Sequence, residues 1–353
     1  MKNKIEIKNN IVHKTYTSRL DYVKEENLYK KLSGSGLAPE LLASQDGYLE
    51  HEYVEGDSFL DLLLASKEDK AKLEEYIKKF CIWYEKYREL TKLTLGEVRF
   101  DKFILSGDRL INIDFEHSKP GYLEDDFARL VAQMLINDEA FSESNINTAK
   151  FFIYVASKTV SWIPEIFSNS LSKAIIAECK KQKVLVNEPK MEMLITFLTS
   201  AGIVFAGSEG TSVECSKDIN LLPERYVVLH KGKAPSSILL DDFVKISISG
   251  GTDSVLQRLV EAQANVTQMW TICVTADMPR IPQIMWQALL SAEKKDYAAV
   301  MVEAGGKLRE FPLLLNTAKT RLELEHAYKK GATSLTEVLS SMPINVLKIE
   351  DIR

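Results

Sequence analysis

Basic and acidic residues suited to phosphoryl transfer follow one another in the first third of the chain. Lys14 ends a predicted strand, and Glu25 lies in the predicted helix that follows. Glu97 comes after a glycine, and Asp114 ends a later apolar stretch. Phosphoryl transfer from ATP needs a lysine on the phosphates, a carboxylate that holds this lysine, a metal-binding aspartate and a base near the acceptor hydroxyl. The types and order of these four residues therefore predict a phosphotransferase-like first half.

Two motifs near Asp114 resemble a known family. Asp114-Phe115-Glu116 follows an apolar stretch, and Asp126-Phe127-Ala128 opens the next predicted helix. Both resemble motifs of the aminoglycoside phosphotransferase and choline kinase branch of the protein-kinase-like enzymes. The resemblance covers roughly residues 1–180. It implies an α+β protein-kinase-like domain with a reduced N-lobe, and a Mg²⁺ ion held by Asp114.

Other nucleotide contacts are expected from the same resemblance. Lys14 and Glu25 would form the ion pair on the ATP phosphates, and the segment with Glu52 and Val54 would be the hinge that contacts the adenine. Glu97 would be the catalytic base. A simpler interpretation places Lys14 and Glu25 on a solvated strand end and a solvated helix face.

The segment before Asp114 departs from the family's His-Gly-Asp-x4-Asn pattern. Leu95 stands at the histidine, Glu97 at the catalytic aspartate and Lys102 at the metal-binding asparagine. The extra methylene of a glutamate displaces its carboxylate by about 1 Å, and such a displacement costs about 10²-fold in rate. Lys102 brings a positive charge to the expected place of a second Mg²⁺. The alternative to an active enzyme is therefore a catalytically retired protein that binds nucleotide or another ligand, or assists assembly.

A glycine-containing loop with a lysine is expected in the second half. The apolar stretch Ile203–Ala206 runs into Gly207, and Lys217 follows in the same polar segment. In such a loop glycine lets backbone N–H groups approach nucleotide phosphates, and lysine neutralises their charge. The segment is therefore a candidate phosphate-binding loop, and a solvent-exposed lysine is the alternative for Lys217.

Two more segments of the second half carry residues suited to nucleotide chemistry. Gly250 and Gly251 precede a predicted helix, and Asp277 follows the apolar stretch Trp270–Thr275. Ligands of open α/β sheets bind beyond the carboxyl ends of the strands, so Asp277 is a candidate Mg²⁺ ligand. Helix capping before Pro279 is the alternative role for Asp277.

The order of these segments is similar to that of molybdenum-cofactor guanylyltransferase-like enzymes. Gly207 and Lys217 match their opening loop, whereas Ser208 and Ser212 replace a glycine and an arginine. The resemblance implies an α/β Rossmann-like nucleotidyltransferase domain in residues 191–353, after a kinase-like domain in residues 1–190. It also implies contacts of Ala206, Gly207, Gly250 and Gly251 with the nucleotide and a catalytic role for Lys217.

Periodicity predicts the elements that position these residues. A hairpin is expected around Asn9-Asn10, followed by a helix over Tyr22–Leu32. Ser66–Asp69 is typical of a capping box that opens a long helix, with apolar positions from Leu73 to Leu90. Beyond residue 190, apolar strands alternating with helices predict a parallel sheet covered on both faces.

Composition narrows the possible partners. The 353 residues carry 45 Lys and Arg against 50 Asp and Glu, a net charge of −5, which argues against a nucleic-acid partner. The four cysteines are scattered, so zinc ribbons and a disulfide framework are not expected. No stretch of about 20 apolar residues predicts a membrane span, and the amino terminus lacks the apolar core of a signal peptide. These features favour the cytoplasm.

A nucleoside triphosphate and a small phosphorylated or hydroxyl-bearing acceptor are the expected partners, with Mg²⁺ as cofactor.

Overall fold

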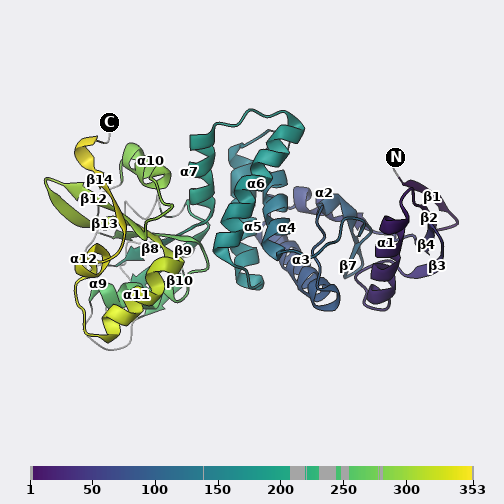
Figure 1. The fold of residues 1–353 in the computed structure, drawn as a ribbon, viewed down its shortest axis with the longest axis horizontal. Helices are drawn as coiled ribbons and strands as arrows, with labels where there is room; N and C mark the ends of the chain where they lie inside the picture. The colour runs from purple at the N-terminus through teal and green to yellow at the C-terminus, as the bar shows by residue number, and fades with distance from the viewer. Residues whose placement is uncertain are drawn as a thin grey trace. The chain divides into compact units, whose positions relative to one another are not determined.

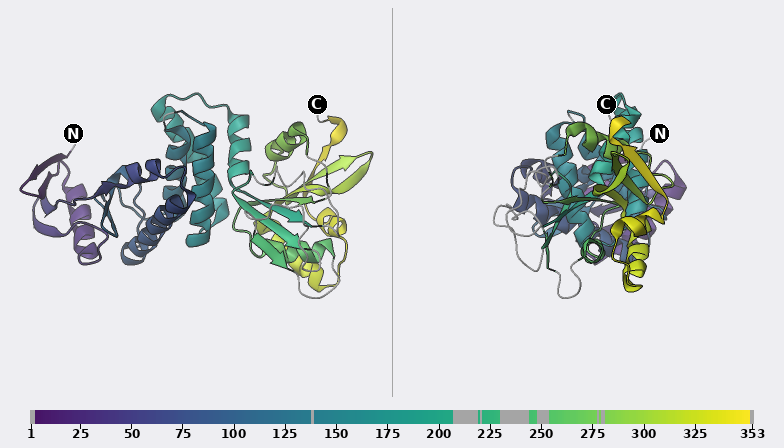
Figure 2. Two further views of the ribbon diagram at one scale, coloured as in Figure 1. Left: turned by 180° about the vertical axis from the view of Figure 1, so that it is seen from behind. Right: turned by 90° about the vertical axis from the view of Figure 1, so that its left-hand side faces the viewer.

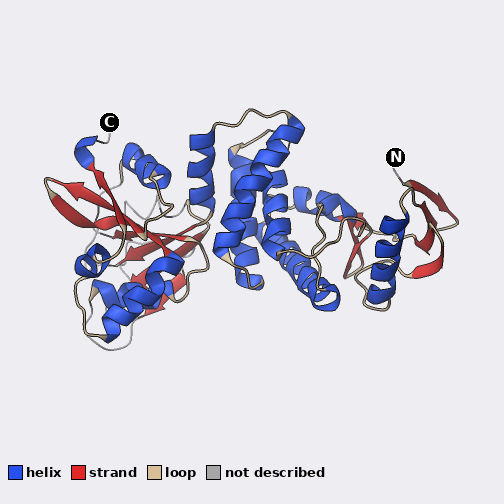
Figure 3. Cartoon of the chain, viewed as in Figure 1, coloured by secondary structure: helices blue, strands red, loops and turns tan. Residues whose placement is uncertain are grey.

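The computed structural model is a mixed α/β chain with several sheets (Figures 1 and 3). The chain divides into two compact units, Met1–Val184 and Leu185–Arg353. In the part of the chain that the structure describes, no helix has both the length and the apolar character needed to cross a membrane. The described residues are 3–137, 139–206, 219, 221–229, 244–247, 254–276, 278 and 281–351.

A four-stranded antiparallel sheet opens the first unit. Its strands lie in the order β1-β2-β4-β3, and helix α1 (Arg19–Leu32) packs against β3 and β4. Asn9 and Asn10 both have positive φ, 51° and 59°, as a tight turn that matches the strand twist requires. The predicted hairpin is therefore confirmed. The strands are β1 (Lys4–Lys8), β2 (Ile11–Thr15), β3 (Leu41–Gln45) and β4 (Tyr48–Glu52).

The beginning of the long helix differs from the prediction. Helix α3 (Lys70–Thr91) starts after Asp69, whose side chain accepts a hydrogen bond from the Lys72 N–H at 3.1 Å. Ser66 instead ends a short helix, α2 (Phe59–Ala65), and its N–H bonds back to the Leu63 carbonyl. The predicted capping box at Ser66–Asp69 is wrong because two helices meet there. The predicted apolar face of α3 is buried, except that Leu90 at its end is 36% exposed.

Most of the remaining first unit is helical. A 3-10 turn, η1 (Phe100–Lys102), leads into the hairpin of β6 and β7, which the short strand β5 extends to three strands. Three long helices follow, and α4 packs on both α5 and α6. The elements are β5 (Asp57–Ser58), β6 (Phe103–Ser106), β7 (Arg109–Asn112), α4 (Leu123–Ile136), α5 (Glu143–Thr159) and α6 (Pro164–Gln182).

The second unit is built on a sheet in the order β10-β9-β8-β11-β13-β12-β14. The four strands β10, β9, β8 and β11 run parallel to one another, and β12 runs parallel to β14. β13 runs antiparallel to both β11 and β12. The strands are β8 (Ser200–Phe205), β9 (Glu224–Leu229), β10 (Val244–Ser247), β11 (Trp270–Thr275), β12 (Ala299–Ala304), β13 (Lys307–Asn316) and β14 (Ile344–Lys348).

The predicted parallel sheet is therefore confirmed except at β13, and a glycine pair gives the reason for the exception. Gly305 and Gly306 have φ of 59° and 71°, so they form a tight turn that reverses the chain between β12 and β13. A two-residue turn joins only antiparallel neighbours, whereas parallel strands need a longer crossover.

Helices cover both faces of this sheet, as predicted (Figure 2). Val204 packs in one apolar cluster with residues of α7 and α10, and its neighbour Ile203 packs in another with residues of α9, α11 and α12. Successive strand residues point to opposite faces, so the two clusters are the two sides of the sheet. The helices are α7 (Glu188–Leu198), α9 (Val255–Gln263), α10 (Gln283–Ser291), α11 (Thr317–Lys329) and α12 (Leu335–Ser340).

Candidate nucleotide site

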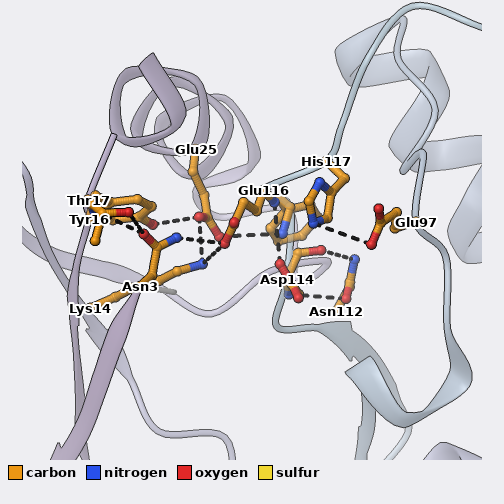
Figure 4. Close-up of polar contacts among 11 residues, drawn as sticks. Asn3, Lys14, Tyr16, Thr17, Glu25, Glu97, Asn112, Asp114, Glu116 and His117 are labelled. Carbon is orange, nitrogen blue, oxygen red and sulfur yellow. Dashed lines mark hydrogen bonds and ion pairs between the residues drawn. The ribbon is translucent and has the colours of Figure 1, made fainter. Parts of the chain in front are cut away.

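A buried ion pair joins the first sheet to helix α1. The Lys14 Nζ on β2 lies 2.7 Å from the Glu25 Oε2 on α1, and these residues are 5% and 0% exposed (Figure 4). Buried charges of this kind need close partners, because leaving water costs each of them several kcal/mol. The structure thus brings together Lys14 and Glu25, and it overturns the interpretation in which both are solvated.

Glu25 has two further hydrogen bonds. The Tyr16 hydroxyl donates to its Oε2 at 2.5 Å, and the Phe115 N–H donates to its Oε1 at 3.4 Å. Burial opposes the charged form of Lys14, but the carboxylates of Glu25, Asp114 and Glu116 outweigh it and raise the Lys14 pKa. Lys14 therefore carries a positive charge at neutral pH.

Asp114 is held at a turn directly after β7. Its N–H donates to the Asn112 Oδ1 at 3.2 Å, and its carbonyl accepts from the Asn112 Nδ2 at 3.0 Å. The Asp114 Oδ1 accepts the Glu116 N–H at 3.3 Å. Asp114 as a whole is half-buried.

Glu116 extends the cluster back to the first sheet. Its Oε2 lies 3.3 Å from the Lys14 Nζ and accepts a hydrogen bond from the Asn3 Nδ2 at 2.8 Å. Sequence reasoning missed Asn3, Tyr16 and Glu116 as members of this site. The sequence gives one indication of this: Tyr16 comes two residues after Lys14, and Glu116 comes two residues after Asp114, a spacing that places side chains on the same side of an extended segment.

The donors of this cluster fit Mg²⁺. One ammonium faces the three carboxylates of Glu25, Asp114 and Glu116, which leaves an excess of negative charge. Mg²⁺ takes oxygen ligands and is commonly held by one or two carboxylates together with substrate phosphates. Asp114 and Glu116 would supply these carboxylates. Among the described residues, no group of three or more His, Cys, Asp or Glu forms a metal site from protein ligands alone.

The loop that carries Glu97 is braced by Asp126. The fully buried Asp126 carboxylate accepts hydrogen bonds from the Leu95 N–H at 2.7 Å, the Gly96 N–H at 3.1 Å and the Tyr84 hydroxyl at 2.5 Å. Gly96 has φ of +78°, and a Cβ there would lie 2.3 Å from the His117 carbonyl oxygen. Only glycine fits this position, so the loop conformation is fixed by Asp126 and Gly96 together.

Glu97 itself is exposed. Its Oε2 lies 3.4 Å from the His117 Nε2, and its side chain keeps 68% of its accessible surface. Lys102 is half-buried in η1, and its carbonyl accepts the Ile113 N–H at 3.0 Å. This backbone hydrogen bond joins η1, which follows the Glu97 loop, to the residue before Asp114. Among the described residues, no ion pair joins Lys102 to Asp114.

The expected hinge residues lie at the end of the first sheet. Glu52 closes β4, where its N–H donates to the Glu40 carbonyl, and Val54 follows in the connection to β5. Both side chains are half-buried. Among the described residues, no hydrogen bond or ion pair joins Glu52 or Val54 to Lys14, Glu25, Asp114 or Glu116.

A row of aromatic rings connects the site to the helices. The Phe115 ring meets the Tyr29 ring of α1 edge-on and stacks against the Tyr87 ring of α3, with centroids 5.6 and 5.9 Å apart. Tyr87 stacks in turn on Trp83, at 5.3 Å and an interplanar angle of 8°. All four side chains are buried, so Phe115 anchors the Asp114 segment between α1 and α3.

In the second unit, Ala206 is the one residue of the expected nucleotide site that lies among the described residues. Ala206 follows β8 and is fully buried, its N–H donates to the Val228 carbonyl, and its own carbonyl accepts from Arg258 Nη1 at 3.3 Å. β8 and β11 are parallel neighbours whose ends pair, Phe205 with Thr275. The other residues predicted here, Gly207, Lys217, Gly250, Gly251 and Asp277, lie outside the described residues.

Comparison with known proteins gives no relative from which to transfer a function. No family model matches the sequence, and no curated protein matches it. A solved structure of a protein from Aquifex aeolicus VF5 (Aq1419) aligns with 43% of this chain and 86% of its own, at 12% sequence identity and a TM-score of 0.33. Similarity at this level carries no argument about function.

Proposed function

We propose that this protein is a two-part transferase. Its first unit, with a kinase-like arrangement, transfers a phosphoryl group from Mg²⁺-ATP to a small hydroxyl-bearing acceptor. Its second unit, an α/β nucleotidyltransferase-like domain, binds a nucleoside triphosphate and a phosphorylated acceptor. The observation that carries the proposal is the buried Lys14–Glu25 pair beside Asp114, because protein kinases use this set of charges to position ATP.

Each residue has a defined task in the first unit. Lys14 binds phosphate oxygens through its ammonium, and Glu25 fixes the position of Lys14. Asp114 holds Mg²⁺, which neutralises phosphate charge when bound. The acceptor hydroxyl attacks the γ-phosphorus and gives its proton to Glu97, and ADP leaves with the electrons of the broken P–O bond.

One observation favours a second candidate function, nucleotide binding without transfer. Glu97 is exposed and lies next to His117, and Lys102 occupies the position at which a second metal ligand is expected. A protein with these substitutions would bind Mg²⁺-ATP through Lys14 and Asp114 and act as a sensor or assembly partner.

Titration of the full chain with ATP tests the first site. Asp114→Asn keeps the backbone contacts of Asp114 but removes its charge, so we expect Mg²⁺-ATP affinity to fall about tenfold and its dependence on Mg²⁺ to disappear. Asp108→Asn, in the exposed β6–β7 turn, is the matched control and should bind as the wild type does. Equal affinity of both variants, measured by calorimetry, would contradict the proposal.

Transfer assays separate the two candidates. With a panel of small alcohols and sugars, Glu97→Gln should abolish phosphoryl transfer and leave ATP affinity unchanged if the first unit is an enzyme. ATP binding with no transfer by the wild-type chain would select the sensor.

Asp277 tests the second unit. Asp277→Asn preserves size and much of any capping ability, so we expect little change in the free energy of unfolding and about a tenfold loss of Mg²⁺-dependent nucleotide binding. The measurement is titration with GTP, CTP and UTP in Mg²⁺, in a Lys14→Met/Glu25→Gln background, in which the site of the first unit is expected not to bind nucleotide. If this variant and its parent bind equally, Asp277 is a helix cap and not a metal ligand.

A further inference from the structure

A cavity of about 350 Å³ lies among the helices of the first unit and is lined by residues of α2, η1, α4, α5 and the end of α6. This volume falls in the range of small-molecule sites. None of the residues that line it belongs to the cluster of Lys14, Glu25, Asp114 and Glu116. The cavity is therefore separate from the proposed nucleotide site. Its apolar wall consists of Leu60, Leu63, Leu64, Phe100, Leu130 and Met134.

Charged side chains gather on one part of the lining. The Arg99 guanidinium holds Asp101 through two hydrogen bonds of 2.9 Å. Lys181 lies 3.6 Å from Glu178. Each of the two carboxylates of the lining is thus paired with a cation, Asp101 with Arg99 and Glu178 with Lys181.

Lys67 is the third cation of the lining. In the described part of the chain, its half-buried side chain has neither an ion pair nor a hydrogen bond, and only its backbone N–H is bonded, to the Leu64 carbonyl. Three cations and two carboxylates therefore leave one positive charge in excess beside an apolar wall.

We propose that this cavity binds a small amphipathic monocarboxylate. The apolar body of the ligand packs against Leu63, Phe100 and Leu130, and its carboxylate pairs with the Lys67 ammonium. A neutral ligand of the same shape leaves Lys67 without a counterion. A cationic ligand meets the excess positive charge, so the lining selects for one negative charge.

Calorimetric titration of the full chain with octanoate, 1-octanol and octylammonium tests this inference. We expect octanoate to bind about tenfold more tightly than octanol, because a hydrogen bond to a charged group accounts for such a factor, and octylammonium to bind more weakly than both. Lys67→Met should reduce octanoate affinity to that of octanol. Lys70→Met removes an exposed lysine at the start of α3, outside the cavity, and should bind as the wild type does.

A second variant tests the location. Met134→Trp places a larger ring at the half-buried edge of the cavity and should weaken all three ligands together. Thermal melts establish that each variant is folded. Absence of octanoate binding, equal binding by Lys67→Met and Lys70→Met, or octylammonium binding as tight as that of octanoate would each overturn the proposal. ATP binding tests the nucleotide site separately, so failure of one proposal leaves the other standing.

Discussion

Replacing Lys14 with methionine should weaken Mg²⁺-ATP binding about 100-fold. The substitution removes the Lys14 ammonium, which interacts with the Asp114 carboxylate, and a charge-assisted hydrogen bond contributes up to about 3 kcal/mol. Methionine keeps the apolar stem of the lysine, so contacts with the sheet persist. Calorimetric titration with ATP in Mg²⁺ measures the change, and unaltered affinity would rule out Lys14 as a phosphate ligand.

A double variant controls for folding. Lys14→Met alone leaves the Glu25 carboxylate buried without its cation, and breaking such a pair costs about 3–5 kcal/mol of stability. Lys14→Met/Glu25→Gln removes both charges, and the single amide oxygen of the glutamine accepts the Tyr16 hydrogen bond, although its NH₂ group cannot accept the Phe115 N–H. We expect this variant to recover stability and still to lack ATP binding. Recovery of ATP binding along with stability would mean that Lys14 acts only on the fold.

Replacing Asp126 with alanine should destabilise the first unit by about 3–5 kcal/mol. The substitution leaves the Leu95 N–H, the Gly96 N–H and the Tyr84 hydroxyl without their acceptor in a buried place. Each such loss costs about 1–3 kcal/mol. Urea denaturation followed by circular dichroism measures the change in the free energy of unfolding.

The neighbouring Asp125 gives a matched control. It is half-buried, and its carboxylate accepts one hydrogen bond, from the Ser170 hydroxyl at 2.6 Å. Asp125→Ala should therefore cost about 1 kcal/mol. If Asp126→Ala were no more destabilising than Asp125→Ala, the bracing of the Glu97 loop by Asp126 would be a minor interaction.

Local features of the first unit were predictable because their causes lie close together in the chain. The tandem asparagines set the first hairpin, and residues with opposite charge on adjacent elements, Lys14 and Glu25, meet once that hairpin forms. The periodicity of α3 likewise predicted which of its residues are buried. Such features depend on turn geometry and on one helix face, which a short window of sequence contains.

Other features depend on contacts between distant segments, which a single sequence does not reveal. The three cations that line the cavity of the first unit, Lys67, Arg99 and Lys181, come from distant segments of the chain. In the Lys14 cluster, the hydrogen bond between Asn3 and Glu116 joins residues 113 positions apart in the sequence. The reversal at Gly305-Gly306 does have a local signal, because two consecutive glycines favour a tight turn.

The aromatic row gives the first unit an optical property. Phe115 is the residue after Asp114, and its ring stacks on Tyr87, which stacks on Trp83. A ligand that shifts the backbone of Asp114 therefore also moves the Phe115 ring, which stacks on Tyr87, and Tyr87 in turn stacks on the indole of Trp83. We therefore expect a ligand that shifts Asp114 to change the emission of Trp83, one of the four tryptophans of the chain.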